Sequence, residues 1–194
     1  RGWWAREGDG LEPGMRTPGD RAGVGAEISL MAFAAGRRGF ILMEDPDRLA
    51  GVASALDLGM EIESLEAPEP LAHDHAFFPV MPLQWTERPV AGKGDSRNAE
   101  VIIASIRKAA TMAQDGTAAA IVTNPINKAI LKDAGFSHPG HTEFLASLAP
   151  ARPGAPLMML AGESLRVVPA TVHIALRDVP AALTTDGIVA KGRL

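Results

Sequence analysis

One long amphipathic helix followed at once by a short apolar strand constrains the fold more than any other feature. In "SRNAEVIIASIRKAATMAQDG" (96–116), apolar residues recur at helical spacing, with Ser96 as the expected N-cap and Gly116 as the expected end. The continuous apolar run "TAAAIVT" (117–123) comes next and predicts a strand that is buried on both faces. A helix that leads directly into such a strand is typical of an α/β protein.

The same alternation extends along much of the chain. Residues 39–44 and 60–66 predict strands, the second near a sheet edge, and 46–58 predicts a helix that begins at a proline. "HAFFPVMPL" (75–83) predicts an extended segment, which its prolines place at an edge or outside the sheet. Two strand-like runs separated by Gly162-Glu163 predict a hairpin. We therefore expect a layered α/β/α fold.

The two ends of the chain lack this patterning. Residues 1–16 show neither helical nor strand periodicity, and we expect them to be an unpatterned N-terminal tail before an α/β region over 17–194. The final segment, "AALTTDGIVAKGRL", reads as the opening of a helix without a closing turn. We expect the chain to be incomplete at this end.

Composition excludes several classes of protein. A formal charge of −4 without a basic patch argues against nucleic acid and acidic membranes as partners. The chain has no cysteine, which excludes disulfides and thiolate chemistry and fits a cytoplasmic protein. No apolar run approaches the roughly 20 residues that span a bilayer.

Two polar stretches next to predicted helices are candidate anion sites. The turn "TPGDRAGVGAEIS" (17–29) leads into a helical run, so it is either a tight turn or a site where backbone N–H groups bind a phosphate or carboxylate. "VTNPINKAI" (122–130) places Lys128 in the first turn of a helix, where a cation is electrostatically unfavourable. Lys128 is either a contact for an anionic ligand or a solvated surface residue.

The stretch "SHPGHTEFL" (137–145) holds two of the five histidines. Pro139-Gly140 forces a turn, and Thr142 or His141 could cap the helix that follows. Capping explains Thr142 well but not His141. A neutral imidazole at a helix N-terminus can hydrogen-bond a substrate or take a proton, so a capping turn and a substrate site both remain open.

The other histidines suggest metal sites less directly. His173 follows an apolar run, and imidazole is the commonest protein ligand for a catalytic divalent metal, but one histidine cannot hold a metal and a structural role is the alternative. His73 and His75 could bind a metal together if they lay on one face of a strand. Their Asp- and Pro-rich setting favours a solvated loop instead.

Taken in order, three stretches resemble one family. They are "TPGDRAGVGAEIS", "AAAIVTNPINKAILKDAGFSHPGHTEFLA" and "MMLAGESLRVVPATVHIALRDVPAALT". These stretches resemble 4-hydroxythreonine-4-phosphate dehydrogenase of vitamin B6 biosynthesis, and also its relatives that act on four-carbon acid-sugar phosphates. The likeness covers roughly residues 17–185, and its GHTEF-type and TNPINK motifs are the most specific.

The resemblance implies a fold, a reaction and site residues. The fold would be isocitrate/isopropylmalate dehydrogenase-like, and the protein a homodimer. The reaction would oxidise 4-phosphohydroxy-L-threonine, a small phosphorylated hydroxy acid, with NAD (or NADP) and a divalent metal (Zn, Mg, Mn or Co), then decarboxylate it to 3-amino-2-oxopropyl phosphate. His141 and Thr142 match substrate-contacting positions, and His173 matches one of three metal-binding histidines. Lys128 is expected near an anionic group of the substrate.

The sequence departs from the family pattern in two respects. The family has proline where Arg21 and Ala26 stand, and its first motif follows a clean strand. The family also continues past residue 194 and there supplies the other two metal histidines, so we expect an N-terminal part of a longer two-domain fold. The alternatives are an inactive truncated fragment or paralogue, or a dehydrogenase of threonate or erythronate 4-phosphate. A phosphate acyltransferase fits the layers but not the histidines.

Overall fold

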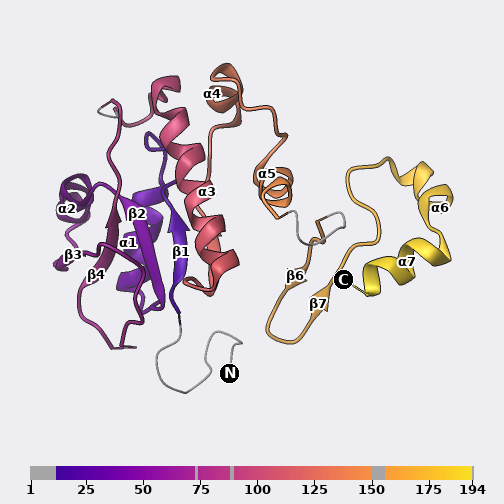
Figure 1. Ribbon diagram of the computed structural model, residues 1–194, viewed down its shortest axis with the longest axis horizontal. Helices are drawn as coiled ribbons and strands as arrows, with labels where there is room; N and C mark the ends of the chain where they lie inside the picture. The colour runs from indigo at the N-terminus through magenta and orange to yellow at the C-terminus, as the bar shows by residue number, and fades with distance from the viewer. Residues whose placement is uncertain (1–11, 73, 88–89, 150–155, 194) are drawn as a thin grey trace. The chain divides into compact units, whose positions relative to one another are not determined.

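The computed structural model describes residues 12–72, 74–87, 90–149 and 156–193. These fall into two compact units, one within residues 6–149 and the other within 150–194 (Figure 1). Within the described residues, no helix has the length and hydrophobicity needed to cross a bilayer.

The larger unit is built on a parallel sheet whose strands lie in the order β3-β4-β2-β1-β5. All four neighbouring pairs are parallel. In chain order the strands are β1 (Gly14–Thr17), β2 (Phe40–Glu44), β3 (Ile62–Ser64), β4 (Phe78–Pro82) and β5 (Ala120–Thr123). The parallel pairing confirms the predicted α/β class, and β3 lies at an edge as expected.

Helices cover both faces of this sheet (Figure 1). Successive side chains of a strand point to opposite faces, so β2 contributes Leu42 to one core and Ile41 and Met43 to the other. On the Leu42 face lie α1 (Gly25–Ala34) and α2 (Pro46–Ala55); on the Ile41 face lies α3 (Ala99–Asp115). The predicted α/β/α layering is confirmed.

Two short helices complete the larger unit. They are α4 (Lys128–Asp133) and α5 (His141–Ser147). Both pack against α3 through a third core, which consists of Ala99, Ile102, Ile106, Leu131, Phe136 and Phe144. The α3 helix therefore fixes α4 and α5 relative to the sheet.

The long helix begins differently from the prediction. A 3-10 turn, η1 (Ser96–Asn98), precedes α3, and the Asp95 carboxylate accepts a hydrogen bond from the Arg97 N–H at 2.9 Å. Asp95 rather than Ser96 thus caps this segment, because a carboxylate is as good a cap as a hydroxyl. The end is as predicted: Gly116 adopts the left-handed conformation.

The first strand corrects the expected tail. Residues 14–16 belong to β1, which lies between β2 and β5, and Met15 is fully buried. A strand of four residues, "GMRT", is too short to show a period and contains one large apolar side chain. The tail boundary therefore lies before residue 14, and the first motif does follow a strand.

Two predictions about strand environment were wrong. Segment 75–83 supplies β4, which lies inside the sheet between β3 and β2. Its pairing with β2 starts at Val80, so the missing N–H of Pro79 falls outside that ladder. By contrast β5 is an edge strand of the described sheet, and Ala120 and Thr123 are exposed. An apolar run does not reveal how many neighbours a strand has.

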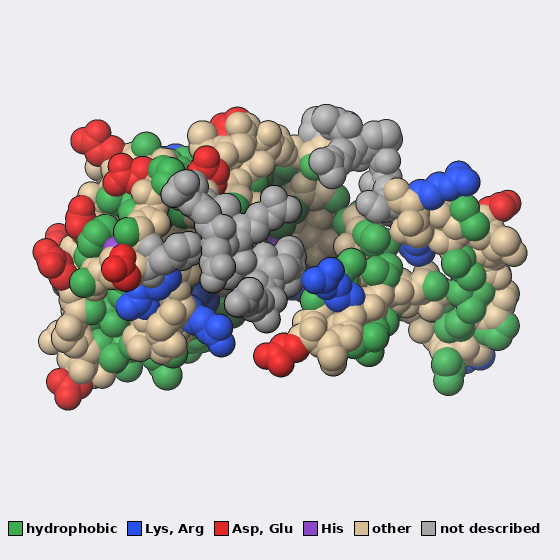
Figure 2. Space-filling model, turned by 90° about the horizontal axis from the view of Figure 1, so that it is seen from below, with side chains coloured by type: hydrophobic (Ala, Val, Ile, Leu, Met, Phe, Trp, Pro, Cys, Tyr) green, Lys and Arg blue, Asp and Glu red, His purple; other side chains and the backbone are tan. Residues whose placement is uncertain are grey.

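The smaller unit has little interior. Its predicted hairpin is confirmed by antiparallel β6 (Leu160–Ala161) and β7 (Arg166–Val167), followed by η2 (Leu176–Asp178), α6 (Val179–Ala182) and α7 (Thr185–Gly192). None of residues 156–193 is buried. Hydrophobic side chains spread over its surface (Figure 2), and Leu176 is 86% exposed.

One tight contact in the larger unit joins the turn after β1 to the loop after β5. Gly19 has φ +74, and a Cβ built on it would lie 2.5 Å from the Pro125 carbonyl oxygen and 2.8 Å from Asn124 Cβ. A Cβ on Gly25 would overlap the carbonyl oxygen of Pro18. The Asp20 N–H donates to the Pro125 carbonyl at 2.7 Å. These glycines allow the two loops to touch.

Replacement of Gly19 by alanine tests this contact, with Gly36→Ala as the matched control. Gly36 also has positive φ (+83), but a Cβ there would meet nothing within 4 Å. Gly36→Ala is expected to lower the free energy of unfolding by ~1 kcal/mol, the cost of a left-handed alanine. Gly19→Ala adds steric overlap and is expected to cost ~2–4 kcal/mol. Urea unfolding measures both, and equal losses would contradict the close contact.

Candidate functional site

The structure brings Lys128 and His141 together from two separate motifs. Lys128 is the first residue of α4, where the Asn127 side chain caps the helix by accepting from the N–H groups of Ala129 and Ile130 at 3.1 and 3.3 Å. His141 is the first residue of α5. A Cβ built on Gly140 would lie 3.5 Å from Lys128 Nζ, so the ammonium group reaches the residue that precedes His141.

His141 is a half-buried histidine with an unused nitrogen. Its Nε2 atom is buried and has no hydrogen-bond partner among the described residues. Burial lowers the pKa of His141, and the positive charge of Lys128 lowers it further. A neutral imidazole with a free ring nitrogen can accept or donate a hydrogen bond to a ligand hydroxyl.

Lys128 has a free charge. In the described part of the chain, no hydrogen bond or ion pair holds its ammonium group, although Glu143 also approaches the Gly140 position, with Oε2 3.3 Å from a Cβ built there. Because Lys128 is also exposed, its unpaired ammonium fits both interpretations, a contact for an anionic ligand and a solvated surface lysine.

The capping reading of the 137–145 stretch is wrong. Gly140 occupies the N-cap position of α5, and no side chain hydrogen-bonds to the cap. Thr142 is exposed, which leaves its hydroxyl accessible to a ligand. His138 is half-buried between Phe136 and Phe144, with ring centroids 5.4 and 5.1 Å away.

The other histidines that the structure describes do not form a metal site. His173 lies in the smaller unit, is exposed, and has φ +59. No three His, Cys, Asp or Glu side chains among the described residues are arranged to hold a metal ion. His75 is buried and its Nδ1 lies 2.8 Å from the Phe77 carbonyl oxygen, so it is not in a solvated loop. His73 lies outside the described residues.

The glycine turn is built for packing. Asp20 N–H is used by Pro125, and the N–H groups of Ala22 and Gly23 donate to Asp20 at 3.0 and 2.9 Å. Three of the backbone donors that could face a phosphate are thus occupied inside the fold. Of the two readings for residues 17–29, the structure supports the tight turn.

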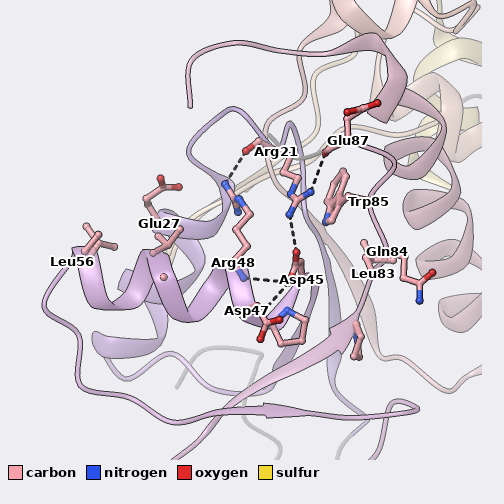
Figure 3. Close-up of a pocket in the computed structure, with 15 residues that line it drawn as sticks. Arg21, Glu27, Asp45, Asp47, Arg48, Leu56, Leu83, Gln84, Trp85 and Glu87 are labelled. Carbon is pink, nitrogen blue, oxygen red and sulfur yellow. Dashed lines mark hydrogen bonds and ion pairs between the residues drawn. The ribbon is translucent and has the colours of Figure 1, made fainter. Parts of the chain in front are cut away.

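A cavity at the carboxyl ends of β2 and β4 was not predicted (Figure 3). It has a volume of about 1070 Å³ and is lined by Arg21, Arg48, Asp45, Leu83, Trp85, Glu87 and their neighbours. Below it, the Glu44 carboxylate is 1% exposed, and lies 3.1 Å from Arg48 and 2.8 Å from the indole nitrogen of Trp85. In the sequence, the signal for this cluster is Glu44, a glutamate at the end of an otherwise apolar strand.

Both arginines of this cavity are paired with protein groups. Arg21 donates to Asp45 at 2.9 Å and to the Glu87 carbonyl at 3.3 Å, and its guanidinium lies 4.7 Å from the Trp85 ring centroid. Burial raises the pKa of Glu44, while the nearby Arg48 opposes that rise. Because both arginines are engaged by protein groups, we assign no residue here to the pyrophosphate of a dinucleotide.

Comparisons with known proteins identify the family of the chain. The family described as pyridoxal phosphate biosynthetic protein PdxA matches residues 38–194. The chain belongs to the PdxA family. That match includes both motifs that carry Lys128 and His141.

Relatives in the PdxA family carry an enzyme name. The 4-hydroxythreonine-4-phosphate dehydrogenases of Methylorubrum extorquens (strain PA1) and Bradyrhizobium diazoefficiens are 41% and 40% identical to the chain. They cover 92% and 94% of it, while the chain covers 54% and 57% of them. The chain therefore spans about half the length of these curated relatives.

Solved structures of enzymes with this name also match most of this chain and about half of their own length. The 4-hydroxythreonine-4-phosphate dehydrogenase from Burkholderia phymatum matches 94% of this chain with a TM-score of 0.81 and 28% identity. The enzyme from Klebsiella pneumoniae matches 91% with a TM-score of 0.78 and 27% identity. In both cases 56% of the solved chain is covered.

The lowered pKa of His141 predicts a pH dependence of stability. Above the unfolded pKa of about 6.5 the imidazole is neutral in both states, and its contribution is fully present. As pH falls below that value, the unfolded chain takes up the proton first, so the free energy of unfolding decreases. Urea unfolding at about pH 7.5 and 5.5 should show a smaller loss for His141→Gln than for the wild type. Equal losses would contradict the assignment.

Proposed function

We propose that the chain provides substrate-binding residues of an NAD-dependent 4-hydroxythreonine-4-phosphate dehydrogenase. The observation that carries the proposal is that the Lys128 ammonium, unpaired among the described residues, lies next to Gly140 and lowers the pKa of His141, whose buried Nε2 has no partner. Family membership supports the substrate class, a small phosphorylated hydroxy acid. The proposed reaction oxidises 4-phosphohydroxy-L-threonine with NAD or NADP and yields 3-amino-2-oxopropyl phosphate after decarboxylation.

Each proposed contact has a chemical task. Lys128 would pair its ammonium with an anionic group of the substrate, as a point charge without fixed directionality. His141, kept neutral, would hydrogen-bond the substrate through Nε2 and orient it. The exposed hydroxyl of Thr142 would add a further hydrogen bond beside it. Together these residues would position the substrate, which is the part of the reaction this chain's described residues can supply.

We keep His173 as a proposed ligand of a divalent metal (Zn, Mg, Mn or Co). A single imidazole in a separate unit does not make a metal site, so we derive no reaction step through a metal. The cytoplasm stays the proposed compartment.

A homodimer is the proposed assembly. Its support is the smaller unit, whose large apolar side chains are solvent-exposed in the single chain, with Leu165 at 66% and Leu160 at 59%. Burial of such side chains against a second copy would remove apolar surface from water.

Binding without turnover is the second candidate, because the chain spans about half the length of its relatives. An inactive fragment or paralogue would retain Lys128 close to His141 and lack catalysis. A relative acting on threonate or erythronate 4-phosphate would share the anionic substrate class but prefer a different compound.

The deciding experiment combines turnover with binding. NADH formation at 340 nm is followed with 4-phosphohydroxy-L-threonine, with and without Zn²⁺, Mg²⁺, Mn²⁺ or Co²⁺, and heat of binding is recorded by calorimetry. Turnover supports the dehydrogenase; binding without turnover supports the second candidate. Preference for threonate or erythronate phosphate reassigns the substrate, and no binding of any of them contradicts the proposed site.

Variants at the two motifs should weaken binding selectively. Lys128→Met and His141→Gln each remove one proposed contact, and each should raise the substrate dissociation constant about tenfold or more, as loss of a hydrogen bond involving a charged group does. Lys132→Met is the matched control, because this exposed lysine lies one turn further along α4. If Lys132→Met weakens binding as much as Lys128→Met, the loss of affinity comes from the reduced positive charge of the protein and not from a specific contact of Lys128.

A further inference from the structure

The side-chain amide of Asn124 is a buried polar group of the larger unit to which the proposed function gives no role. This residue is 1% exposed and uses both ends of its amide. Its Oδ1 accepts from Arg16 Nε at 3.0 Å, and its Nδ2 donates to the Gly25 carbonyl at 3.0 Å and to Ser29 Oγ at 3.1 Å. A buried amide that is fully satisfied fixes the groups it contacts in one arrangement.

These contacts join three elements of the sheet and its cover. Arg16 is in β1, Ser29 is in α1, and Asn124 directly follows β5. The Pro125 carbonyl, next in the chain, accepts from Asp20, and Gly19 lies against both Asn124 and Pro125. The loop after β5 is therefore held against the turn after β1 by side-chain and backbone contacts.

The same loop sets the start of α4. From Asn124 the chain passes Pro125, with its fixed φ, to Asn127, whose side chain caps α4. Further along α4, Ile130 packs against Gly94 and Leu131 is 1% exposed in the core shared with α3. With the loop fixed at one end and the helix at the other, the backbone of Lys128 has little freedom.

We propose that Asn124 is a positioning residue, which holds the loop after β5 so that the Lys128 ammonium lies beside His141. The inference rests on the proposed function for its biological meaning, but the coupling itself concerns the protein without ligand. Asn124 is buried away from solvent and acts through the backbone of residues 125–128, so it is not a substrate contact.

The test measures the pKa of His141 in the ligand-free chain by NMR titration of the imidazole protons. His141→Gln identifies the signal among the five histidines. Lys128→Met should raise the pKa of His141, because it removes a positive charge. Asn124→Ala should raise it in the same direction, because the loop relaxes and Lys128 moves away. Asn124→Ala added to Lys128→Met should produce no further rise.

Ser29→Ala is the matched control. It removes one hydrogen bond of the Asn124 amide and leaves those to Arg16 and Gly25, so the pKa of His141 should stay at the wild-type value. If Asn124→Ala does not fold, Asn124→Thr takes its place, because threonine is neutral, has a similar volume and lacks the amide that reaches Arg16 and Gly25.

Two results would overturn the proposal. One is an unchanged pKa of His141 in a folded Asn124 variant, which would make Asn124 a stabilising residue only. The other is an unchanged pKa in Lys128→Met, which would remove the coupling that Asn124 is said to control. Failure of substrate binding with an intact coupling would instead count against the proposed function, so the two failures are distinguishable.

Discussion

The rest of the larger unit depends on the contact between the turn after β1 and the loop after β5. This contact is possible because Gly19 has no side chain, so the backbone of Gly19 can lie against Asn124 and Pro125. The Asn124 amide then ties β1 and α1 to the same loop. Because parallel strands end at one edge of the sheet, this single contact orders the edge where the polar groups gather.

Much of the fold could be predicted from local pattern. The 96–116 helix and its glycine end, the strand at residues 39–44 and the hairpin around Gly162 all appear where their periods and turn residues indicate. The failures concern properties that depend on distant neighbours. β1 is too short to show a period, and the central place of β4 or the edge place of β5 is decided by pairing partners that local sequence does not specify.

The candidate site, too, could be predicted from the sequence only in part. The unfavourable position of Lys128 and the extra histidine in "SHPGHTEFL" could be noticed in the sequence, and their meeting could not, because α3 and the shared core bring α4 and α5 together. The ion cluster of Arg21, Glu44 and Arg48 was missed because its members come from three elements. His173 belongs to the smaller unit, whereas Lys128 and His141 belong to the larger one.

The most direct test of the central claim is a crystal structure of this chain soaked with 4-phosphohydroxy-L-threonine. The proposed site predicts ligand density with an anionic group beside Lys128 Nζ and a hydrogen bond to His141 Nε2. Ordered ligand elsewhere, for example in the cavity beside Trp85, with Lys128 and His141 left in contact with solvent, would contradict it.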